Sequence, residues 1–260
     1  MNRNNPKKLL EYVKSLVKHT GESFVSTVKN TSMEVSYSSD FPKEIKSNLD
    51  KILEEEIISG LLSLNIPILS EEAGYINIDK DSEYLFIVDP LDGTFNFTRG
   101  LGPYAISVAL WSKNKPIFGV VYNLLSHELI WGSSEIGSYC NDKKIQVSDV
   151  NEVGLAVLCT GFPVRYNFSD IGQEADFWNV MQSYSKIRML GSATISLINV
   201  AKGSADVYAE KDIMIWDVAA GIPIVEGAGG KVYYTETTYG NALNVFASNS
   251  LLVKHNFLIP

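Results

Sequence analysis

Two aspartates at the end of an apolar run constrain this chain more than any other feature of its sequence. The run 84–88 is predicted to be a buried strand, and Asp89 and Asp92 follow it across a turn. Carboxylates this close repel each other unless a positive charge lies between them, and hard divalent cations bind carboxylate and carbonyl oxygens. Gly93 and Thr94 come next and can begin a helix whose free N–H groups bind an anion. The segment therefore predicts a metal site beside a phosphate site.

The composition is that of an ordinary globular protein and excludes some partners. The 260 residues are 45% hydrophobic and 20% charged, which allows one large domain or two halves packed together. The net charge of −8 argues against binding to nucleic acid or to an anionic membrane. Neither a signal peptide nor a membrane-spanning segment is expected. We expect Cys140 and Cys159 to be free thiols rather than a disulfide, and the protein to be cytoplasmic.

Helical and strand patterns predict a mixed α and β protein. Apolar residues recur every three or four positions in 6–18 and 43–63, which predicts helices, and 22–37 is a candidate hairpin. Short apolar runs then predict an antiparallel meander, and from about residue 153 strands alternate with helices. The predicted strands are 66–70, 84–88, 105–112, 116–122, 128–132, 137–139, 155–159, 187–190, 205–208, 231–234 and 245–247. The later predicted helices are 170–184, 193–201, 216–226 and a short one at the C-terminus.

Three further acidic residues become informative only in combination with Asp89. Glu71 follows the predicted strand 66–70, and by itself it is more typical of a charged surface turn. Asp217 stands near the start of a predicted helix, where an aspartate usually acts as a cap. Asp50 lies among apolar residues of the predicted helix 43–63. A neighbouring strand and a cleft between the two halves would be needed to bring these acids together.

The chain resembles the inositol monophosphatase family, which includes magnesium-dependent phosphatases of the fructose-1,6-bisphosphatase type. The blocks that carry the resemblance are Glu71-Glu72, Asp89-Pro90-Leu91-Asp92-Gly93-Thr94, Gly191-Ser192-Ala193 with Gly203-Ser204-Ala205-Asp206-Val207-Tyr208, and Trp216-Asp217-Val218-Ala219-Ala220-Gly221. The resemblance implies an α+β fold, a five-layer αβαβα sandwich with an antiparallel-sheet first half and a mixed-sheet second half. It implies one domain over 1–260, with halves of roughly 1–148 and 149–260 and the active site between them. Relatives commonly form homodimers.

The resemblance also implies a set of metal ligands for two or three Mg²⁺ ions. Glu71, Asp89 and the Leu91 carbonyl would hold the first ion. Asp89, Asp92 and Asp217 would hold the second, so that Asp89 bridges the pair. A third, weaker ion would share Glu71 with waters. A water bound to such ions has a lowered pKa, which makes hydroxide available near neutral pH.

The remaining implied roles concern the attacking water and the substrate. Thr94, paired with Asp50, would orient and help to deprotonate the water, with Glu71 as the third catalytic residue. The N–H groups of Gly93 and Thr94 would contact the phosphate. Taken alone, Glu210 is typical of a solvated loop charge, but the family often places a hydroxyl-binding acid there. The implied substrate-binding residues are Asp92, Gly93, Thr94, Gly191, Ser192, Ala193, Glu210 and Asp217.

Three positions depart from the family pattern. The stretch 44–50 keeps Asp50 but lacks the usual threonine before it, and the loop at about 30–41 carries no lysine. Phe95 stands where a second threonine is usual, and we expect it to alter the pocket lining rather than the chemistry. The first two departures put the third metal and the activation of water in question.

The expected activity is hydrolysis of inositol monophosphate or a related sugar or polyol phosphate by metal-activated water. Such an enzyme binds a small-molecule phosphate ester and needs neither nucleic acid nor membrane. An alternative is a fructose-1,6-bisphosphatase or a dual-specificity enzyme, for which Arg165, Lys186 and Arg188 are candidate contacts of a second phosphate. A less favoured alternative is a non-catalytic regulator that binds a phosphorylated metabolite.

Overall fold

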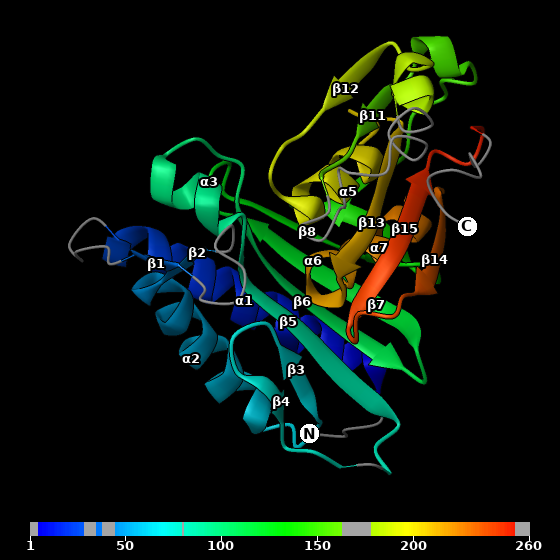
Figure 1. Ribbon diagram of the computed structural model, residues 1–260. Coiled ribbons are helices and arrows are strands. Elements are labelled where there is room, and N and C mark those ends of the chain that lie inside the picture. Colours follow the sequence, from blue (N-terminus) through cyan, green and yellow to red (C-terminus); the bar gives the residue numbers. More distant parts are fainter. Residues whose placement is uncertain (1–4, 29–34, 38–44, 80, 163–177, 253–260) are drawn as a thin grey trace.

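The computed structural model describes residues 5–28, 35–37, 45–79, 81–162 and 178–252 (Figure 1). Two long helices, α1 (Pro6–Val28) and α2 (Asn48–Leu62), precede the first large sheet, and a short antiparallel pair, β1 (Val35–Tyr37) and β2 (Ile45–Ser47), lies between them in the chain. The predicted helix 6–18 therefore continues to Val28, and the predicted hairpin is wrong for 22–28. Gly21 lies where α1 packs directly on β7. A Cβ at this position would be 2.2 Å from the Tyr122 ring, so glycine allows the helix to continue in close contact with the strand. Residues 45–47 of the predicted helix 43–63 form β2 instead, and 43–44 lie outside the described residues.

The first large sheet has eight strands in the order β10-β9-β8-β7-β6-β5-β3-β4. Every neighbouring pair is antiparallel except β3 and β5, so the predicted antiparallel first half holds apart from this parallel pair. Neither β4 nor β10 was predicted, because both have three residues and no apolar run. The strands are β3 (Ile68–Ser70), β4 (Gly74–Ile76), β5 (Tyr84–Asp92), β6 (Ala105–Ser112), β7 (Lys115–Asn123), β8 (Glu128–Ser133), β9 (Gly137–Cys140) and β10 (Lys143–Ile145).

The second sheet has five strands in the order β12-β11-β13-β15-β14. Strand β11 is parallel to both of its neighbours and the other pairs are antiparallel, which confirms the predicted mixed sheet. Strand β13 is longer than the predicted 205–208, and β12 ends two residues before the predicted 190. The elements are a 3₁₀ turn η1 (Val153–Leu155), β11 (Val157–Cys159), β12 (Lys186–Arg188), β13 (Val207–Met214), β14 (Lys231–Glu236) and β15 (Ala242–Ser248).

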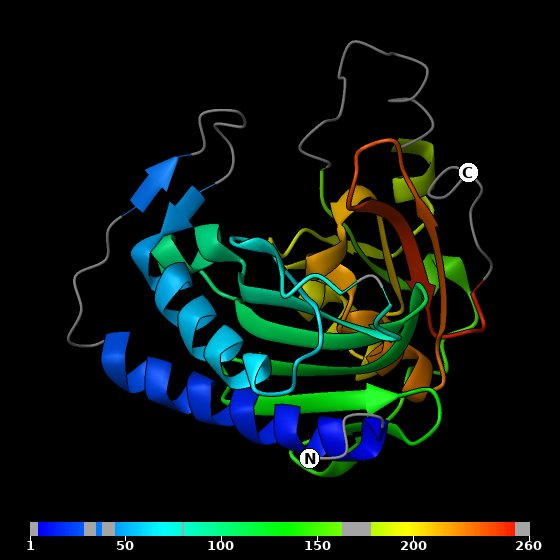
Figure 2. The ribbon, with the colours of Figure 1, turned by 90° about the horizontal axis from the view of Figure 1, so that it is seen from below.

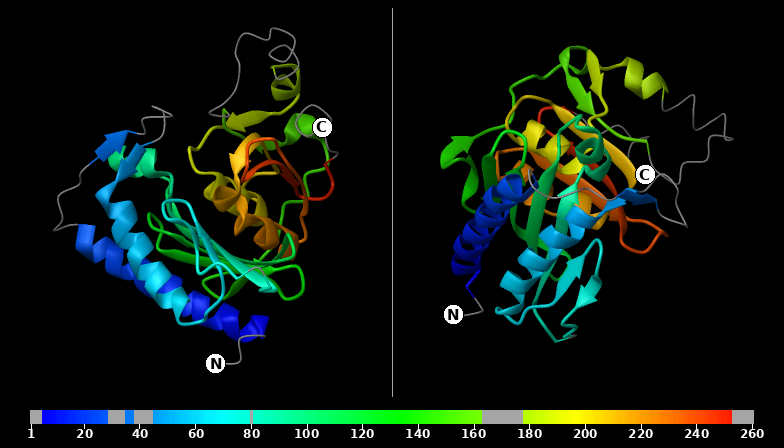
Figure 3. Two further views of the ribbon diagram at one scale, coloured as in Figure 1. Left: turned by 60° about the horizontal axis from the view of Figure 1, so that its bottom comes forward. Right: turned by 90° about the vertical axis from the view of Figure 1, so that its left-hand side faces the viewer.

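Helices separate and cover the two sheets (Figures 2 and 3). Helices α1 and α2 cover the outer face of the large sheet. Helices α5 (Ala193–Ala201), α6 (Ile215–Val218) and α7 (Gly221–Gly227) lie between the sheets, so the predicted helix 216–226 is in fact two helices. The helical residues 178–182 pack on the outer face of the small sheet through Met181. The layered α+β fold is confirmed.

Several parts of the predicted secondary structure lie outside the described residues, including 29–34 of the candidate hairpin 22–37. Residues 170–177 of the predicted helix 170–184 are among them, and so is the predicted C-terminal helix. The division into halves near residue 148 stays a prediction. A short helix, α3 (Thr94–Arg99), begins directly after β5, as Gly93-Thr94 predicted.

Candidate active site

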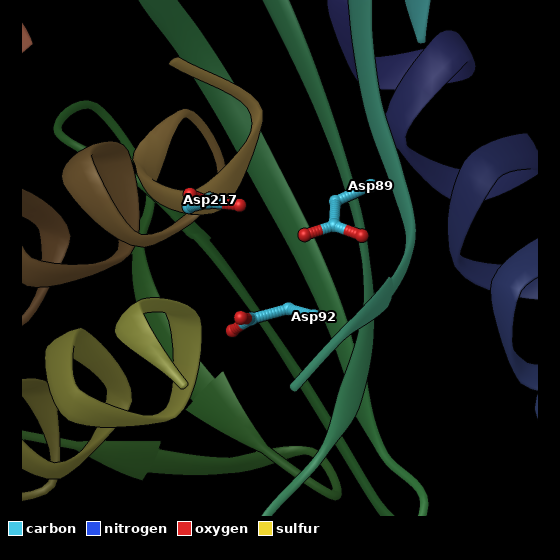
Figure 4. Close-up of side chains that lie close together, drawn as sticks. All are labelled: Asp89, Asp92 and Asp217. Atoms are coloured by element: carbon cyan, nitrogen blue, oxygen red, sulfur yellow. The ribbon is translucent and has the colours of Figure 1, made fainter. Parts of the chain in front are cut away.

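Three aspartates from distant parts of the sequence meet between the sheets. Asp89 and Asp92 stand at the end of β5, and Asp217 lies in α6. One carboxylate oxygen of each lies within 4.8 Å of the others. Figure 4 shows the Asp89 side chain pointing across the space toward Asp217, with Asp92 beside both. The cluster therefore depends on the packing of α6 against β5.

An irregularity in β5 places Asp89 and Asp92 on the same side. Residues three apart in a regular strand point to opposite faces of the sheet. Here Asp89 pairs with Ser107 and Asp92 pairs with Ala105, so the register shifts by one residue between them. Such a bulge reverses the alternation and tolerates Pro90, which has no N–H to donate. The motif lies within the strand and not after it, which corrects the sequence prediction.

Burial raises the pKa values of these acids. For Asp89 and Asp217 burial raises the pKa well above its usual value, and the charges of Glu71 and Asp92 raise both further. Burial also raises the pKa of Glu71 to about 8, with the charges of Glu72, Asp50 and Asp92 adding to the shift. Glu71 does not belong to the cluster of Asp89, Asp92 and Asp217. Its backbone amide, however, donates to Val88 O at 3.2 Å, and Val88 directly precedes Asp89. The structure therefore brings Glu71 alongside the cluster.

The residues of this cluster fit a hard divalent cation. Asp89 Oδ1 accepts a hydrogen bond from the Leu91 amide at 2.9 Å, but Asp89 Oδ2 is buried without a hydrogen-bond partner among the described residues. A buried oxygen of this kind, facing other carboxylates, is costly unless a cation neutralises it. All the side-chain atoms that could contact a metal here are oxygens, and oxygen ligands suit Mg²⁺ better than softer metals.

The N-terminus of α5 holds Asp92 in place. Asp92 Oδ2 accepts hydrogen bonds from Ser192 Oγ at 2.6 Å and from the Thr194 amide at 2.8 Å. Ser192 is also the N-cap of α5, since its Oγ accepts from the Ile195 amide at 3.1 Å. Burial raises the pKa of Asp92 to about 6, although these hydrogen bonds oppose the shift. A carboxylate that accepts two hydrogen bonds is held in a fixed position.

Thr194 was missed by sequence reasoning. Its amide binds Asp92, and its hydroxyl donates to the backbone oxygen of Asp217 at 2.9 Å. Thr194 is fully buried and so links two of the three clustered acids. Ser192, two residues earlier, was the available signal. A serine before an apolar helical run is typical of a helix N-cap, and the backbone amides of the first turn, including that of Thr194, are then free to bind an acid.

The turn between β5 and α3 requires glycine. Gly93 has a φ of +88°, and a Cβ there would lie 2.8 Å from Pro103 O. Thr94 begins α3, and its hydroxyl donates to Leu91 O at 2.9 Å. Asp50 is buried on α2 close enough to Glu71 to raise its pKa. Pairing of Thr94 with Asp50 stays a prediction.

A cavity of about 360 Å³ opens beside Asp92 and Asp217. Glu210 faces it, accepts a hydrogen bond from the Tyr208 hydroxyl at 3.0 Å, and has its pKa raised by burial to about 7. Phe95 is half exposed and is not among the described lining residues, so its expected effect on this lining is not seen. The described lining is Asp92, Thr160, Gly161, Phe162, Met189, Gly191, Ser192, Ala193, Ser196, Glu210, Ile213 and Asp217.

The candidate contacts of a second phosphate do not reach this cavity within the described structure. Lys186 and Arg188 lie exposed on β12 and are absent from the described lining. Arg165 falls outside the described residues, as does most of the divergent loop 30–41.

Comparison with known proteins gives consistent matches. A model described as the inositol monophosphatase family matches residues 5–258. The Nus factor SuhB of Pasteurella multocida is 37% identical over 72% of this chain and 70% of its own length. The fructose-1,6-bisphosphatase/inositol-1-monophosphatase of Aquifex aeolicus is 33% identical over 84% and 81%. The crystal structure of the extragenic suppressor protein suhB of Bartonella henselae aligns with a TM-score of 0.81 at 32% identity, covering 94% of this chain and 95% of that one.

Proposed function

Because the chain belongs to the inositol monophosphatase family, we propose that this phosphatase is a magnesium-dependent phosphomonoesterase acting on inositol monophosphate or a related sugar or polyol phosphate. The observation that carries the proposal is the convergence of Asp89, Asp92 and Asp217 beside a cavity lined by Glu210. A metal site adjoining a cavity rich in hydrogen-bonding groups suits a phosphate ester of a polyhydroxy compound.

The proposed metal ligands follow from this arrangement. Glu71, Asp89 and the Leu91 carbonyl would hold one Mg²⁺, and Asp89, Asp92 and Asp217 a second, with Glu71 shared by a third. When bound, the ions supply an activated water and stabilise charge on the phosphoryl oxygens. Asp89 suits the bridging role, since its buried Oδ2 lacks a partner among the described residues.

The chain itself would supply orientation and proton handling. The N–H groups of Gly93 and Thr94 would bind the phosphate oxygens, which holds the phosphorus in line with the attacking water. Thr94, with Asp50 and Glu71, would orient that water and accept its proton. In the cavity, Glu210 and Asp217 would accept hydrogen bonds from substrate hydroxyls. The loop Gly191-Ser192-Ala193 would contact the leaving group.

The charge of the cavity favours a monophosphate over a bisphosphate. Asp92, Glu210 and Asp217 line it, and no lysine or arginine does so among the described residues. A second phosphate placed here would meet like charge, so the alternative of a fructose-1,6-bisphosphatase is less well supported. A purely regulatory protein would be favoured by loss of a metal ligand, and Glu71, Asp89, Asp92 and Asp217 are all present.

We also propose a cytoplasmic location, which the two free cysteines support because a reducing compartment keeps thiols unpaired. Among the described helices, none is both long enough and apolar enough to cross a bilayer.

A substrate panel tests the proposed activity. Phosphate release would be measured from inositol 1-phosphate, fructose 1,6-bisphosphate, glycerol phosphate and adenosine monophosphate, after removal of metal with EDTA and after addition of Mg²⁺. We expect Mg²⁺-dependent release that is fastest with a polyol monophosphate and is lost in Asp92→Asn. Absence of turnover with every substrate, or full turnover in Asp92→Asn, would contradict the proposal.

A further inference from the structure

We propose that Asn96 is a positioning residue that locks the phosphate-binding turn 93–94 to Leu190 and Gly191, where the substrate loop 191–193 begins. Asn96 lies in α3, and none of the roles assigned above includes it. Its effect on catalysis rests on the proposed function, but its effect on the structure does not.

The Asn96 amide connects three segments of chain. Its Nδ2 donates to Leu190 O at 2.6 Å and to Pro103 O at 2.9 Å, and lies 3.4 Å from Gly191 O. Leu190 is 94 residues away in the sequence and enters from the second half of the molecule. Asn96 is only 8% exposed, so water does not replace these contacts easily.

The same three segments touch through their backbones. A Cβ on Gly93 would lie 2.8 Å from Pro103 O and 3.3 Å from Gly191 O. Gly191 has a φ of +68°, and a Cβ there would lie 3.0 Å from Asn96 Oδ1. A side chain at Gly93 would meet the backbone, and one at Gly191 would press on the Asn96 amide itself, so the three segments are closely packed here.

The contacts of Asn96 close a ring around Asp92. From Asp92 the chain runs through Gly93 to Asn96, whose amide binds the carbonyls of Leu190 and Gly191. The next residue, Ser192, donates back to Asp92 Oδ2 at 2.6 Å. Figure 4 shows the Asp92 side chain extended toward α5, the helix that Ser192 caps. The ring therefore holds a proposed metal ligand, the phosphate-binding turn and the substrate loop in one fixed arrangement.

The separation between the phosphate and the polyol hydroxyls is set by this ring. Chemistry is sensitive to misplacement on the scale of 1 Å, which can reduce a rate by about 100-fold. Asn96→Asp keeps the shape of the side chain but removes both donors and places a carboxylate against three carbonyl oxygens. Asn96→Ser keeps one donor on a shorter side chain.

Asn249 provides a matched control. It is 1% exposed, and its Nδ2 donates to Val150 O at 2.7 Å and to Ser148 Oγ at 2.9 Å. It lies after β15 and contacts none of the site residues named above. Asn249→Asp therefore removes a comparable buried amide without touching the ring.

Hydrogen–deuterium exchange of the metal-free protein gives a readout that needs no activity. In Asn96→Asp we expect 92–96 and 190–196 to exchange faster by a similar factor of about tenfold or more, because both lose the same tie. In Asn249→Asp the faster exchange should be confined to residues near 148–150 and 249–252. Unchanged exchange of 190–196 in Asn96→Asp would overturn the proposal.

Kinetics test the consequence for catalysis. We expect kcat/KM for inositol 1-phosphate to fall about tenfold or more in Asn96→Asp, and further than for p-nitrophenyl phosphate, which has no hydroxyls for the substrate loop. The kcat/KM of Asn96→Ser should lie between those of the wild type and Asn96→Asp. An equal fall for both substrates, matching that of Asn249→Asp, would overturn the positioning role. A wild-type protein that hydrolyses neither ester contradicts the proposed function, while the exchange experiment still decides the role of Asn96.

Discussion

Asp89 in β5 and Asp217 in α6 come from distant parts of the sequence and present carboxylate oxygens within 4.8 Å of each other. Burial raises the pKa of each, and Glu71 raises both further. Holding these acids together costs free energy of folding, which a bound cation would offset. The pair is therefore a point at which stability and the proposed function oppose each other.

Asp217→Asn should stabilise the metal-free protein and impair the metal-bound one. The substitution removes one buried acid from the cluster, so the Tm of the metal-free protein should rise at pH 8. Mg²⁺ affinity and kcat/KM should each fall by about 100-fold, more than is usual for residues behind a ligand. Calorimetry and a phosphate-release assay measure these effects. Asp149→Asn, at an exposed site, should change neither, and a lowered Tm of metal-free Asp217→Asn would contradict the account.

The metal-free protein should lose stability as the pH rises from about 4.5 to 8. The pKa values of Glu71, Glu210 and Asp92 are raised in the folded state, to about 8, 7 and 6, so the folded state binds more protons in this window than the unfolded chain. The free energy of unfolding then falls by about 1.4 kcal/mol per pH unit for each proton of difference. Thermal unfolding between pH 5 and 8.5 tests this.

Addition of Mg²⁺ should remove most of this pH dependence, because the ion binds the ionised carboxylates. Glu210→Gln should remove only the part near pH 7. A metal-free Tm that increases from pH 5 to pH 8 would show that these groups are ionised when buried.

Gly93→Ala should be more harmful than the same change at Gly74. Both residues have a positive φ, which costs a non-glycine residue about 1–2 kcal/mol. Only at Gly93 would the new Cβ meet a backbone oxygen, since nothing lies within 4 Å of a Cβ at Gly74. We expect both variants to lose the ~1–2 kcal/mol of stability that a positive φ costs. Gly93→Ala should lose further stability and also its phosphatase activity. Equal effects in chemical denaturation and activity assays would argue against a tight turn at the site.

Glu54 should support Glu71 through the loop that follows β3. Glu54 Oε1 accepts hydrogen bonds from Ser70 Oγ at 2.5 Å and from the Ala73 amide at 2.9 Å. Glu54→Ala should weaken Mg²⁺ binding by about tenfold, because it releases the segment that carries Glu71. Glu54→Gln keeps an oxygen that accepts both bonds and should bind Mg²⁺ almost as tightly as the wild type. Titration calorimetry with Mg²⁺ measures the three affinities. Equal affinities of the wild type, Glu54→Ala and Glu54→Gln would show that Glu54 does not support Glu71.

The expected homodimer should depend on the surface around α3. Leu101 and Leu125 are 68% and 58% exposed, Phe95 is half exposed, and Leu125 lies close to Gly102; exposed apolar side chains of this kind pair with another protein. We propose that a second copy of the chain covers it. Leu101→Asp should convert a dimer into a monomer in analytical ultracentrifugation. Ile78 is an isoleucine near β4 that is as exposed as Leu101, so Ile78→Asp serves as the control and should remain dimeric. A wild-type monomer would contradict this proposal.

Much of the site was predictable because its chemistry is concentrated in short segments. Asp89, Asp92, Gly93 and Thr94 lie within six residues, and the strand before them and the helix after them follow from local patterns. The positions of α5 and of most strands of the meander followed from the same periodicity. Glu71, Asp217 and Glu210 had ambiguous local patterns and were identified through the resemblance.

Other features depended on contacts between distant segments. Helix α1 extends beyond the predicted Lys18 because Gly21 lets it lie on Tyr122, and a propensity-based boundary does not contain that contact. The ends of β13 and the separation of α6 from α7 also reflect packing between the sheets. Asn96 gave no local signal for its role, since its partners lie in other segments, and the serine before Thr194 indicates a helix start without showing which acids Thr194 contacts.

The sequence by itself determined which residue types are available: two carboxylates at a strand end, and a Gly-Thr pair that can begin a helix. Those properties depend on a few neighbouring residues, so they can be read from the chain. Only the tertiary structure decided that the bulge in β5 turns Asp89 and Asp92 to the same side and that α6 brings Asp217 to them. Burial then raises their pKa values, because desolvation depends on the whole packed molecule.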